Sequence, residues 1–258
     1  MPNKSLRVLS YNIHKGFTAG RGKFVLEKIK DAISLVKADI VFLQEVLGEH
    51  SEHKRNLADW PAIPQFNYLA DKLWPHVVYG KNAVYEEGHH GNAILSKFPV
   101  LFHEKIDVSA HRFEQRGLLH VVVNVPKIQC PLHVLCVHFG LTRRGRDFQI
   151  DLLLNRVKKF IPNADPLIIA GDFNDWTERA TRKLEELAGV HEVFFRRYGA
   201  HARTFPSNMP FLKLDRIYCR GFSTLRAEVL TGLPWSSLSD HAAVFAELEL
   251  LRKYNSHQ

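Results

Sequence analysis

The residues of this chain that are best suited to chemistry are acidic, amide and imidazole side chains placed where apolar, strand-like runs stop or start. They occur in five short stretches: Tyr11-Asn12-Ile13, Leu43-Gln44-Glu45, Val137-His138-Phe139, Gly171-Asp172-Phe173-Asn174 and Ser239-Asp240-His241. Sheet proteins often carry their functional residues where buried strands end and loops begin. Carboxylate and amide oxygens suit a hard divalent cation, and imidazoles transfer protons or contact phosphate. The set therefore indicates a metal-dependent hydrolase.

Each stretch also has an ordinary structural explanation when it is considered alone. Asp172 and Asn174 fall in one turn, where a side chain can satisfy its own backbone. Glu45 fits a surface position at a strand end, and a single histidine such as His138 is commonly satisfied in the core. The pair Asp240-His241, however, stands directly before another apolar run. The joint occurrence of such residues at separate strand ends favours the chemical interpretation.

The elements that must position these residues are mainly strands. We expect strands at residues 6–13, 39–43, 92–96, 118–125, 132–138, 167–170, 212–218 and 242–248, and helices at residues 24–33 and 147–160. Residues 46–90 are the least regular part, and we expect a long loop there that faces the substrate. Strands outnumber helices and no segment repeats at a fixed period, which favours two packed sheets flanked by helices.

Length and composition favour one compact protein without a membrane segment. With 258 residues and 45% hydrophobic content, the chain can bury one substantial core, so we expect a single domain over residues 1–258. The opening Met1-Pro2-Asn3-Lys4-Ser5 has no apolar signal core, and no segment approaches the roughly 18 apolar residues of a membrane span. Cys130, Cys136 and Cys219 show no metal-ligand spacing, which favours reduced thiols. We therefore expect a cytoplasmic protein, most simply a monomer.

The charge of the chain favours polyanionic partners without identifying one. The formal net charge is +8 and the isoelectric point is near 9.4. Such an excess attracts phosphate-bearing ligands. The densest basic groups, Arg143-Arg144-Gly145-Arg146 and Arg196-Arg197, are short. A solvated basic face, a nucleic-acid groove and a site for anionic phospholipid all remain open.

The same residues carry a resemblance to a known family. Leu9-Ser10-Tyr11-Asn12, Gln44-Glu45, Gly171-Asp172-Phe173-Asn174 and Ser239-Asp240-His241, in this order and at these separations, resemble the endonuclease/exonuclease/phosphatase superfamily over about residues 6–249. The resemblance implies an α/β fold of the DNase I-like kind, a four-layer sandwich of two mixed β-sheets packed face to face with helices outside. It also implies an active site at one edge of the sandwich and attack of water on a phosphoester with Mg²⁺, for which Mn²⁺ would substitute.

Carried over residue by residue, the resemblance implies a metal site and a group that activates water. Glu45 would be the principal metal ligand, with Asn12 and Asp240 close to the same ion. Asp172 would orient and deprotonate the attacking water, and Asn174 would hold a phosphoryl oxygen. These roles agree with the residue types, because a cation neutralises charge on the phosphoryl group and a carboxylate activates water.

The resemblance also implies groups that contact the phosphate. His241 would contact it, fixed by Asp215, and His138 would stabilise the developing charge or aid departure of the leaving group. Arg116, in Glu114-Gln115-Arg116-Gly117, stands where the family often presents an arginine to the substrate, although a surface ion pair would explain it as well. Asn92, in a segment running to Pro99 that resembles the sphingomyelinase-like bacterial branch, would lie near the substrate.

One position departs from the pattern of some nucleases in the superfamily. They carry an acidic residue two places after the first-strand asparagine, whereas this chain has His14. The departure does not change the expected reaction. It leaves the metal affinity and the number of bound ions undetermined by the sequence. The pair His89-His90 is a candidate for a transition-metal site, but adjacent residues on a strand point to opposite faces, which disfavours it.

The sequence thus predicts a Mg²⁺-dependent phosphodiesterase that acts by in-line attack of water. Its substrate would be nucleic acid, supported by the basic charge, or a phospholipid or other small phosphodiester, supported by the segment around Asn92. One alternative is a catalytically inactive polyanion-binding protein, but a decayed site should have lost at least one of the polar residues above. Another is a phosphomonoesterase acting on a sugar or inositol phosphate, which product analysis would distinguish.

Overall fold

The computed structural model describes residues 5–20, 22–111, 114–126 and 128–252. Residues 1–4, on which the expectation about a signal segment partly rests, lie outside the described residues. Within the described part, none of the helices combines the length and the apolar character that a membrane crossing needs. All three cysteines are free, as the sequence predicts.

Two six-stranded sheets form the centre of the molecule. The first has the order β11-β12-β1-β2-β4-β3 and is built from β11 (Phe222–Leu230), β12 (Ala243–Leu250), β1 (Ser5–Asn12), β2 (Ile40–His50), β4 (Gly88–Ser96) and β3 (His76–Tyr85). The second has the order β5-β6-β7-β8-β10-β9 and is built from β5 (Val100–Asp107), β6 (Gly117–Val123), β7 (Leu132–His138), β8 (Leu167–Asp172), β10 (Asp215–Arg220) and β9 (His191–Glu192). Both sheets are mixed, because β1 pairs parallel to β2 and β7 parallel to β8 while the other pairs are antiparallel.

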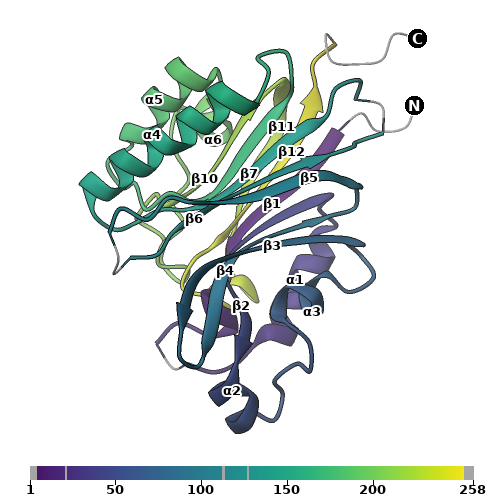
Figure 1. The fold of residues 1–258 in the computed structure, drawn as a ribbon, viewed down its shortest axis with the longest axis vertical. Coiled ribbons are helices and arrows are strands. Elements are labelled where there is room, and N and C mark those ends of the chain that lie inside the picture. The colour runs from purple at the N-terminus through teal and green to yellow at the C-terminus, as the bar shows by residue number, and fades with distance from the viewer. Residues whose placement is uncertain (1–4, 21, 112–113, 127, 253–258) are drawn as a thin grey trace.

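Helices form the two outer layers of the sandwich. They are α1 (Leu26–Val36), α2 (Ser51–Asn56), α3 (Gln65–Ala70), α4 (Arg143–Phe160), α5 (Arg179–Ala188) and α6 (Val193–Tyr198), with two short 3₁₀ turns, η1 (His14–Gly16) and η2 (Trp235–Ser237). Helices α4, α5 and α6 lie together on one side, whereas α1 and α3 lie on the other, and α2 is at the far end of the first sheet (Figure 1). The predicted four-layer sandwich with mixed sheets and outer helices is confirmed.

The apolar residues that build these layers follow the expected periods. In α1 the buried Leu26, Ile29 and Ile33 recur at helical spacing and pack on the first sheet. Helix α4 begins where Thr142 Oγ1 accepts a hydrogen bond from the backbone N–H of Gly145 at 3.2 Å, an N-terminal cap that the sequence-based start at residue 147 missed. Its buried apolar face, with Leu153, packs on the second sheet.

Three apolar clusters fill the spaces between the layers, and the strands alternate between them. On β7, Val134 and Cys136 face the space between the sheets, whereas Leu135 and Val137 face the helices. This two-residue period means that the next polar residue on the inward face is His138. The same parity applies to Asn12 after Val8 on β1, to Asp172 after Ile168 and Ala170 on β8, and to Asp215 before Ile217 on β10. The strands therefore point these polar side chains toward one another at the open edge of the sandwich.

The expectation of a long loop over residues 46–90 is wrong. Strand β2 continues to His50, and helices α2 and α3, strand β3 and the start of β4 follow it. The pairing of β2 with β4 shifts register between Leu43 and Val46, and that of β3 with β4 shifts between Lys81 and Ala83. Such bulges interrupt the alternation of apolar and polar residues, which removes the signal by which a strand is recognised.

Other elements were missed for a related reason. Strands β5 and β11 lie at or near the sheet edges, and most side chains of β5 are exposed. Because an edge strand needs little apolar surface, its sequence resembles that of a loop.

Gly171 is a glycine that the site requires, because it stands directly before Asp172 where β8 passes β7. Its φ is +148°, and a Cβ built there would lie 2.0 Å from the carbonyl oxygen of Val137. A side chain is therefore opposed by both backbone strain and a backbone clash.

We predict that Gly171→Ala lowers the free energy of unfolding by about 2–4 kcal/mol, because the Val137 carbonyl belongs to a paired strand and cannot move away freely. Urea unfolding followed by circular dichroism measures this change. The control is Gly199→Ala, where φ is +72° but the added Cβ meets nothing within 4 Å. It should cost only about 1 kcal/mol, and equal losses in the two variants would contradict the assigned clash.

Candidate active site

Strand register brings three of the predicted residues into one row across the second sheet. His138 is the partner of Asp172 in the β7–β8 pair, and Asp215 is the partner of Asp172 in the β8–β10 pair. On the first sheet, Asn12 is the partner of Gln44, the residue before Glu45. The rows end at the same edge of the sandwich, so residues more than 200 positions apart in sequence meet there.

One oxygen of the buried Asp172 carboxylate is the point on which the site converges. Asn12 Nδ2 lies 3.1 Å from Asp172 Oδ2, His138 Nε2 lies 3.5 Å from it, and His241 Nε2 lies 3.6 Å from it. The other oxygen, Oδ1, accepts a hydrogen bond from the backbone N–H of Asn174 at 2.9 Å. Donors from both sheets thus surround one carboxylate, and the Asn12 bond joins the sheets directly.

His241 is held as a cation by two buried carboxylates. Its Nδ1 lies 2.8 Å from Asp215 Oδ2, and the ring of Phe205 packs against it with 5.0 Å between centroids. Burial opposes charge on the imidazole, but the carboxylates of Asp215 and Asp172 outweigh it and raise the pKa of His241 to about 10. Burial also raises the pKa of Asp172 to about 6, against the pull of the His241 cation. At neutral pH the site therefore holds an ionised Asp172 beside a protonated His241.

His138 differs from His241 in its protonation state. Burial, together with the positive charge of Arg116, lowers the pKa of His138 to about 3, so that the ring is neutral at neutral pH. Two imidazoles that face the same carboxylate oxygen thus differ in charge, because only His241 has a carboxylate partner of its own at its second nitrogen. One imidazole is suited to attract an anion, and the other to accept or pass a proton.

Glu45 and Asp240 form a second, more accessible group beside Asp172. Their side chains are partly exposed, and His14 Nδ1 lies 3.3 Å from Asp240 Oδ2 and 4.0 Å from Glu45 Oε2. Burial opposes ionisation of Glu45, but His138, then the amide of Asn12 and the cation of Lys15, lower its pKa to about 2. His14, Lys15 and Glu45 all have positive φ, of 44°, 59° and 55°. Backbone strain of this kind gathers at functional sites, where the surrounding structure maintains it.

The donor set of this second group fits a hard divalent cation. Mg²⁺ prefers one or two carboxylates and keeps several waters, which partly exposed Glu45 and Asp240 permit. Asp172, Asp215 and His241 also offer ligand atoms within 4.8 Å of one another and form a possible metal site. Their bonds to each other and their burial suit proton transfer better, because an ion would have to displace the His241 proton. Of the two groups, the accessible pair is the better suited to a cation, and its predicted role as metal ligands remains a prediction.

The side-chain amide of Asn12 directs its nitrogen, and not its oxygen, at the neighbouring carboxylates. Its Oδ1 accepts a hydrogen bond from the backbone N–H of His14 at 3.1 Å, so its Nδ2 is directed at Glu45 Oε1, at 3.2 Å, and at Asp172. The amide therefore orients two carboxylates as a donor. Its predicted role as a metal ligand remains a prediction.

The remaining predicted residues lie around this centre at different depths. Asn174, with φ +48°, donates through Nδ2 to the carbonyl of Phe139 at 2.9 Å, which fixes the turn after Asp172. Arg116 Nη2 lies 3.6 Å from Glu114 Oε1, an ion pair near His138. Asn92 is completely buried and donates to the carbonyl of Gly117 at 2.9 Å. Because Gly117 follows Arg116 directly, this bond can help to position the arginine. The predicted contact of Asn92 with substrate remains a prediction.

Two residues near the centre were not predicted from the sequence. Lys15 and His90 both act electrostatically on Glu45, or are acted on by it, and burial lowers the pKa of His90 to about 4. A lysine between the polar strand end at Asn12 and the turn at Gly16 is the signal that would identify the first. His90 was weighed only as a metal ligand, and its position opposite Leu47 on β2, near Glu45, follows from strand pairing that the sequence does not reveal.

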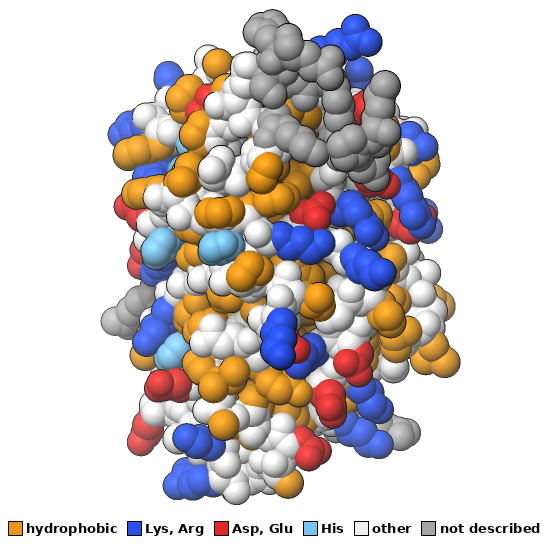
Figure 2. All heavy atoms as spheres, turned by 90° about the vertical axis from the view of Figure 1, so that its right-hand side faces the viewer, with side chains coloured by type: hydrophobic (Ala, Val, Ile, Leu, Met, Phe, Trp, Pro, Cys, Tyr) orange, Lys and Arg blue, Asp and Glu red, His pale blue; other side chains and the backbone are white. Residues whose placement is uncertain are grey.

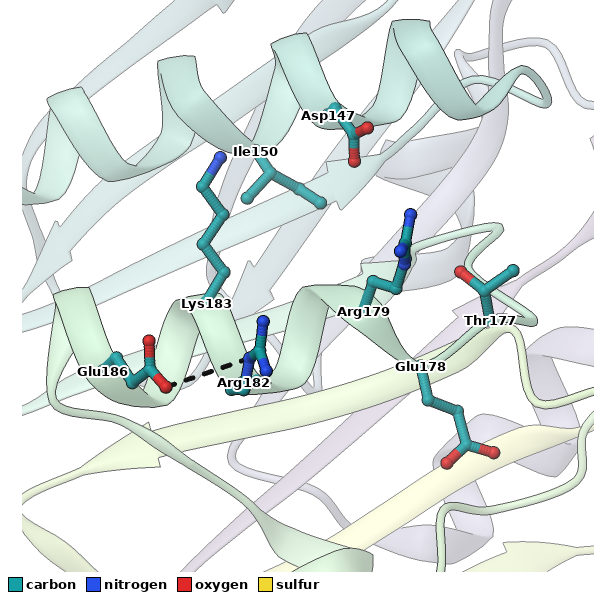
Figure 3. A pocket seen from close by; sticks show the side chains of 8 residues that line it. All are labelled: Asp147, Ile150, Thr177, Glu178, Arg179, Arg182, Lys183 and Glu186. Atoms are coloured by element: carbon teal, nitrogen blue, oxygen red, sulfur yellow. Dashed lines mark ion pairs between the residues drawn. The ribbon is translucent and has the colours of Figure 1, made fainter.

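Basic charge and concave shape do not by themselves identify another site. On the face shown in Figure 2, Lys and Arg side chains are scattered among acidic and apolar ones. A groove of about 620 Å³ lies between α4 and α5 (Figure 3), but none of the predicted site residues lines it. Three basic and three acidic side chains line it, with Arg182 and Glu186 paired at 3.9 Å, so the lining carries no net charge for a phosphate.

Comparisons with known proteins agree with this fold. The model of the endonuclease/exonuclease/phosphatase family matches residues 9–241. The chain is 44% identical to the uncharacterized protein YbhP of Escherichia coli K12 over 246 residues, 95% of this chain and 97% of that protein. It is similar in structure to mannosyl-6-phosphatase Bt3783 of Bacteroides thetaiotaomicron, with a TM-score of 0.71 and 18% identity over 94% of this chain and 99% of that one. It is also similar to D. rerio TDP2 complexed with a single-strand DNA product, with a TM-score of 0.69 and 18% identity over 95% and 99%.

The carboxylate partner of His241 yields a prediction about that residue's charge. In Asp215→Asn, the pKa of His241 should fall by about 1–3 pH units, because the neutral amide removes the nearest charge that stabilises the imidazolium. NMR titration of the His241 ring in chelator measures this change. Asp31→Asn, on the exposed face of α1, is the matched control and should leave the titration as in the wild type. An unaltered His241 pKa in Asp215→Asn would show that the pair does not hold the charge.

Proposed function

The chain belongs to the endonuclease/exonuclease/phosphatase family, whose members hydrolyse phosphoester bonds and generally depend on a divalent metal, and on that premise we propose that it is a Mg²⁺-dependent phosphodiesterase. The observation that carries the proposal is the convergence of Asn12, His138 and His241 on one oxygen of Asp172. This carboxylate stands beside the accessible pair Glu45 and Asp240. A base, an anion-attracting cation and a cation-binding pair are what hydrolysis of a phosphodiester needs.

The accessible pair would hold the metal. Glu45 and Asp240 would bind Mg²⁺, or Mn²⁺ in its place, and the cation would neutralise charge on the phosphoryl oxygens. Asn12 orients Glu45 for this role through the bond from its amide nitrogen. His14 lies against both carboxylates, so it keeps them close together where another family member would add negative charge.

Asp172 is the group that would activate water. With a pKa of about 6 it is ionised at neutral pH and still basic enough to take a proton. The backbone N–H of Asn174 and the amide of Asn12 fix its two oxygens in place. A water that reaches Oδ2 would thus meet a carboxylate held in one orientation.

The two histidines would act on the phosphate and on protons. The His241 cation, fixed in orientation by Asp215, would attract a phosphoryl oxygen. The neutral His138 would pass a proton toward the leaving group or stabilise charge there. Arg116, near His138, supplies a guanidinium that suits two phosphate oxygens at once.

The fold does not identify which class of phosphodiester is the substrate. One structural neighbour was solved with single-strand DNA product and another is a mannosyl-6-phosphatase, so similar folds serve different substrates. Completeness of the catalytic set, with Glu45, Asp172, Asn174, Asp240 and His241 all in place, favours an enzyme over an inactive polyanion-binding protein.

We predict that the wild type hydrolyses bis(p-nitrophenyl) phosphate with Mg²⁺ or Mn²⁺ and that Asp172→Asn lowers kcat by about a hundredfold to ten-thousandfold, because the base is lost. Activity should vanish in chelator and return with added metal. The rate of the wild type should rise with pH through about 6, where Asp172 loses its proton. Release of p-nitrophenolate is the measurement, and Asp31→Asn is the control.

Equal rates in the wild type and in Asp172→Asn would show that Asp172 is not the general base. If bis(p-nitrophenyl) phosphate is not hydrolysed but inorganic phosphate is released from sugar phosphates, the protein is instead a phosphomonoesterase.

We also predict that Glu45→Gln weakens Mn²⁺ binding at least about tenfold, since even changes beyond the direct ligands of a metal cost that much. Isothermal titration calorimetry measures the affinity without any turnover. Glu49→Gln, which alters an exposed glutamate on the same strand, should bind like the wild type. Unchanged affinity in Glu45→Gln would move the cation to the buried group of Asp172, Asp215 and His241.

A further inference from the structure

Loops that leave the strands at the active-site edge carry large apolar side chains at their tips. We call these side chains the apolar border: Leu141, Trp176, Met209, Phe211 and Leu233, which are between 46% and 84% exposed. Each loop is close in sequence to a residue of the site. Leu141 follows His138 by three positions, Trp176 follows Asn174 by two, Phe211 precedes Asp215 by four and Leu233 precedes Asp240 by seven.

The loops that carry the border are joined to one another. The Arg146 guanidinium lies 4.4 Å from the Trp176 ring centre and donates to the carbonyl of Leu141 at 2.6 Å. Lys213 pairs with Glu178, which joins the Trp176 loop to the loop of Met209 and Phe211. That loop is bonded in turn to the loop of Leu233, because Ser207 Oγ donates to the carbonyl of Ser239 at 2.6 Å.

The border is also attached to the site itself. The backbone N–H of Ser207 donates to the carbonyl of Asp240 at 2.8 Å, and Phe205 packs on His241. The backbone N–H of Leu141 donates to Glu114 at 3.1 Å, next to Arg116. A surface that meets the border would therefore lie directly over the catalytic centre.

Charge around the border is positive. Arg143, Arg144 and Arg203 are exposed beside it, with Arg143 paired to Asp147 at 3.9 Å. Residues 203–213 and 231–239 contain no acidic residue. The acids of the Trp176 loop are already bonded, Asp175 to Thr177 and Ala180, and Glu178 to Lys213. Apolar tips with arginines beside them complement an anionic lipid surface, which offers hydrocarbon and negative charge together.

Nucleic acid complements the same border less well. Single strands are bound by aromatic rings that stack on bases and by cationic grooves along the backbone. Three of the five tips, Leu141, Met209 and Leu233, are aliphatic and cannot stack in this way. Exposed aliphatic side chains held on bonded loops are suited to an apolar environment.

We propose that the apolar border docks this protein on the surface of an anionic phospholipid bilayer and delivers the phosphodiester of a phospholipid head group to the site. The proposal rests on the phosphodiesterase function above. Docking of this kind needs no membrane-crossing element, because only loop tips enter the interface.

Co-flotation with vesicles in chelator tests docking without turnover. We expect the full-length protein to float with vesicles of phosphatidylglycerol and phosphatidylcholine, and less with phosphatidylcholine alone. The triple variant Leu141→Ser, Met209→Ser, Leu233→Ser should lose about tenfold or more in vesicle affinity. The matched control is Leu35→Ser with Leu187→Ser, which removes leucines that are 77% and 65% exposed on α1 and α5 and should float like the wild type.

A second variant tests the charge separately from the apolar tips. Arg143→Gln with Arg144→Gln should lower binding to the anionic vesicles severalfold and leave binding to phosphatidylcholine as it was. Circular dichroism confirms that each variant is folded.

Several outcomes would overturn the proposal. The first is that the wild type fails to float with anionic vesicles. The second is that the Leu35 and Leu187 control loses as much vesicle affinity as the triple variant. The third is that a single-stranded oligonucleotide binds through the border while vesicles do not bind. Hydrolysis of bis(p-nitrophenyl) phosphate by the wild type, measured without vesicles, reports on the proposed function separately. Diester hydrolysis without flotation would refute docking alone, whereas border-dependent flotation without any diester hydrolysis would refute the enzyme alone.

Discussion

The buried carboxylate of Asp172 is the interaction on which the rest of the structure depends. An isolated carboxylate in the interior is very costly, and it is tolerated only where donors and opposite charge surround it. Here the donors come from both sheets and from the segment before β12: Asn12, His138, His241 and the backbone of Asn174. Each sheet must therefore keep its register to the residue, because a slip by one position would turn a donor to the opposite face.

The features that look irregular in isolation follow from this requirement. Gly171 permits β8 to pass so close to the Val137 carbonyl that His138 and Asp172 become neighbours. Glu45 adopts positive φ where the pairing of β2 shifts register between Leu43 and Val46, and Asn174 adopts positive φ in the turn after β8. The strain costs stability, and the packed sheets on either side maintain it. Stability and chemistry are thus set by the same few backbone positions.

The parts of the site that were predictable from the sequence are those governed by local pattern. An apolar run that stops on Asn12, His138 or Asp172 shows where a strand leaves the core, and the two-residue period shows which face the polar residue takes. The expectation that a strand also ends at Glu45 is wrong, because β2 continues to His50. Pairings between strands are not local. The bond of Asp215 to His241 was available only through family resemblance, and the place of His90 near Glu45 depends on a bulged pairing. The orientation of the Asn12 amide is set by the backbone N–H of His14, which no residue pattern reveals.

The division between buried site and exposed loops explains how one framework can serve different substrates. Asp172 and its donors lie on paired strands, so a change there affects the whole edge. The loops that begin at the same strand ends need only keep their anchoring bonds, such as that of Ser207 to the Asp240 carbonyl, and their tips are free to differ. Those anchoring bonds also bring the loops into contact with the site, because Asp240 lies beside His14 and the neighbouring His241 contacts Phe205. A partner that contacts the loop of Met209 would therefore lie two contacts away from His14, through Ser207 and Asp240.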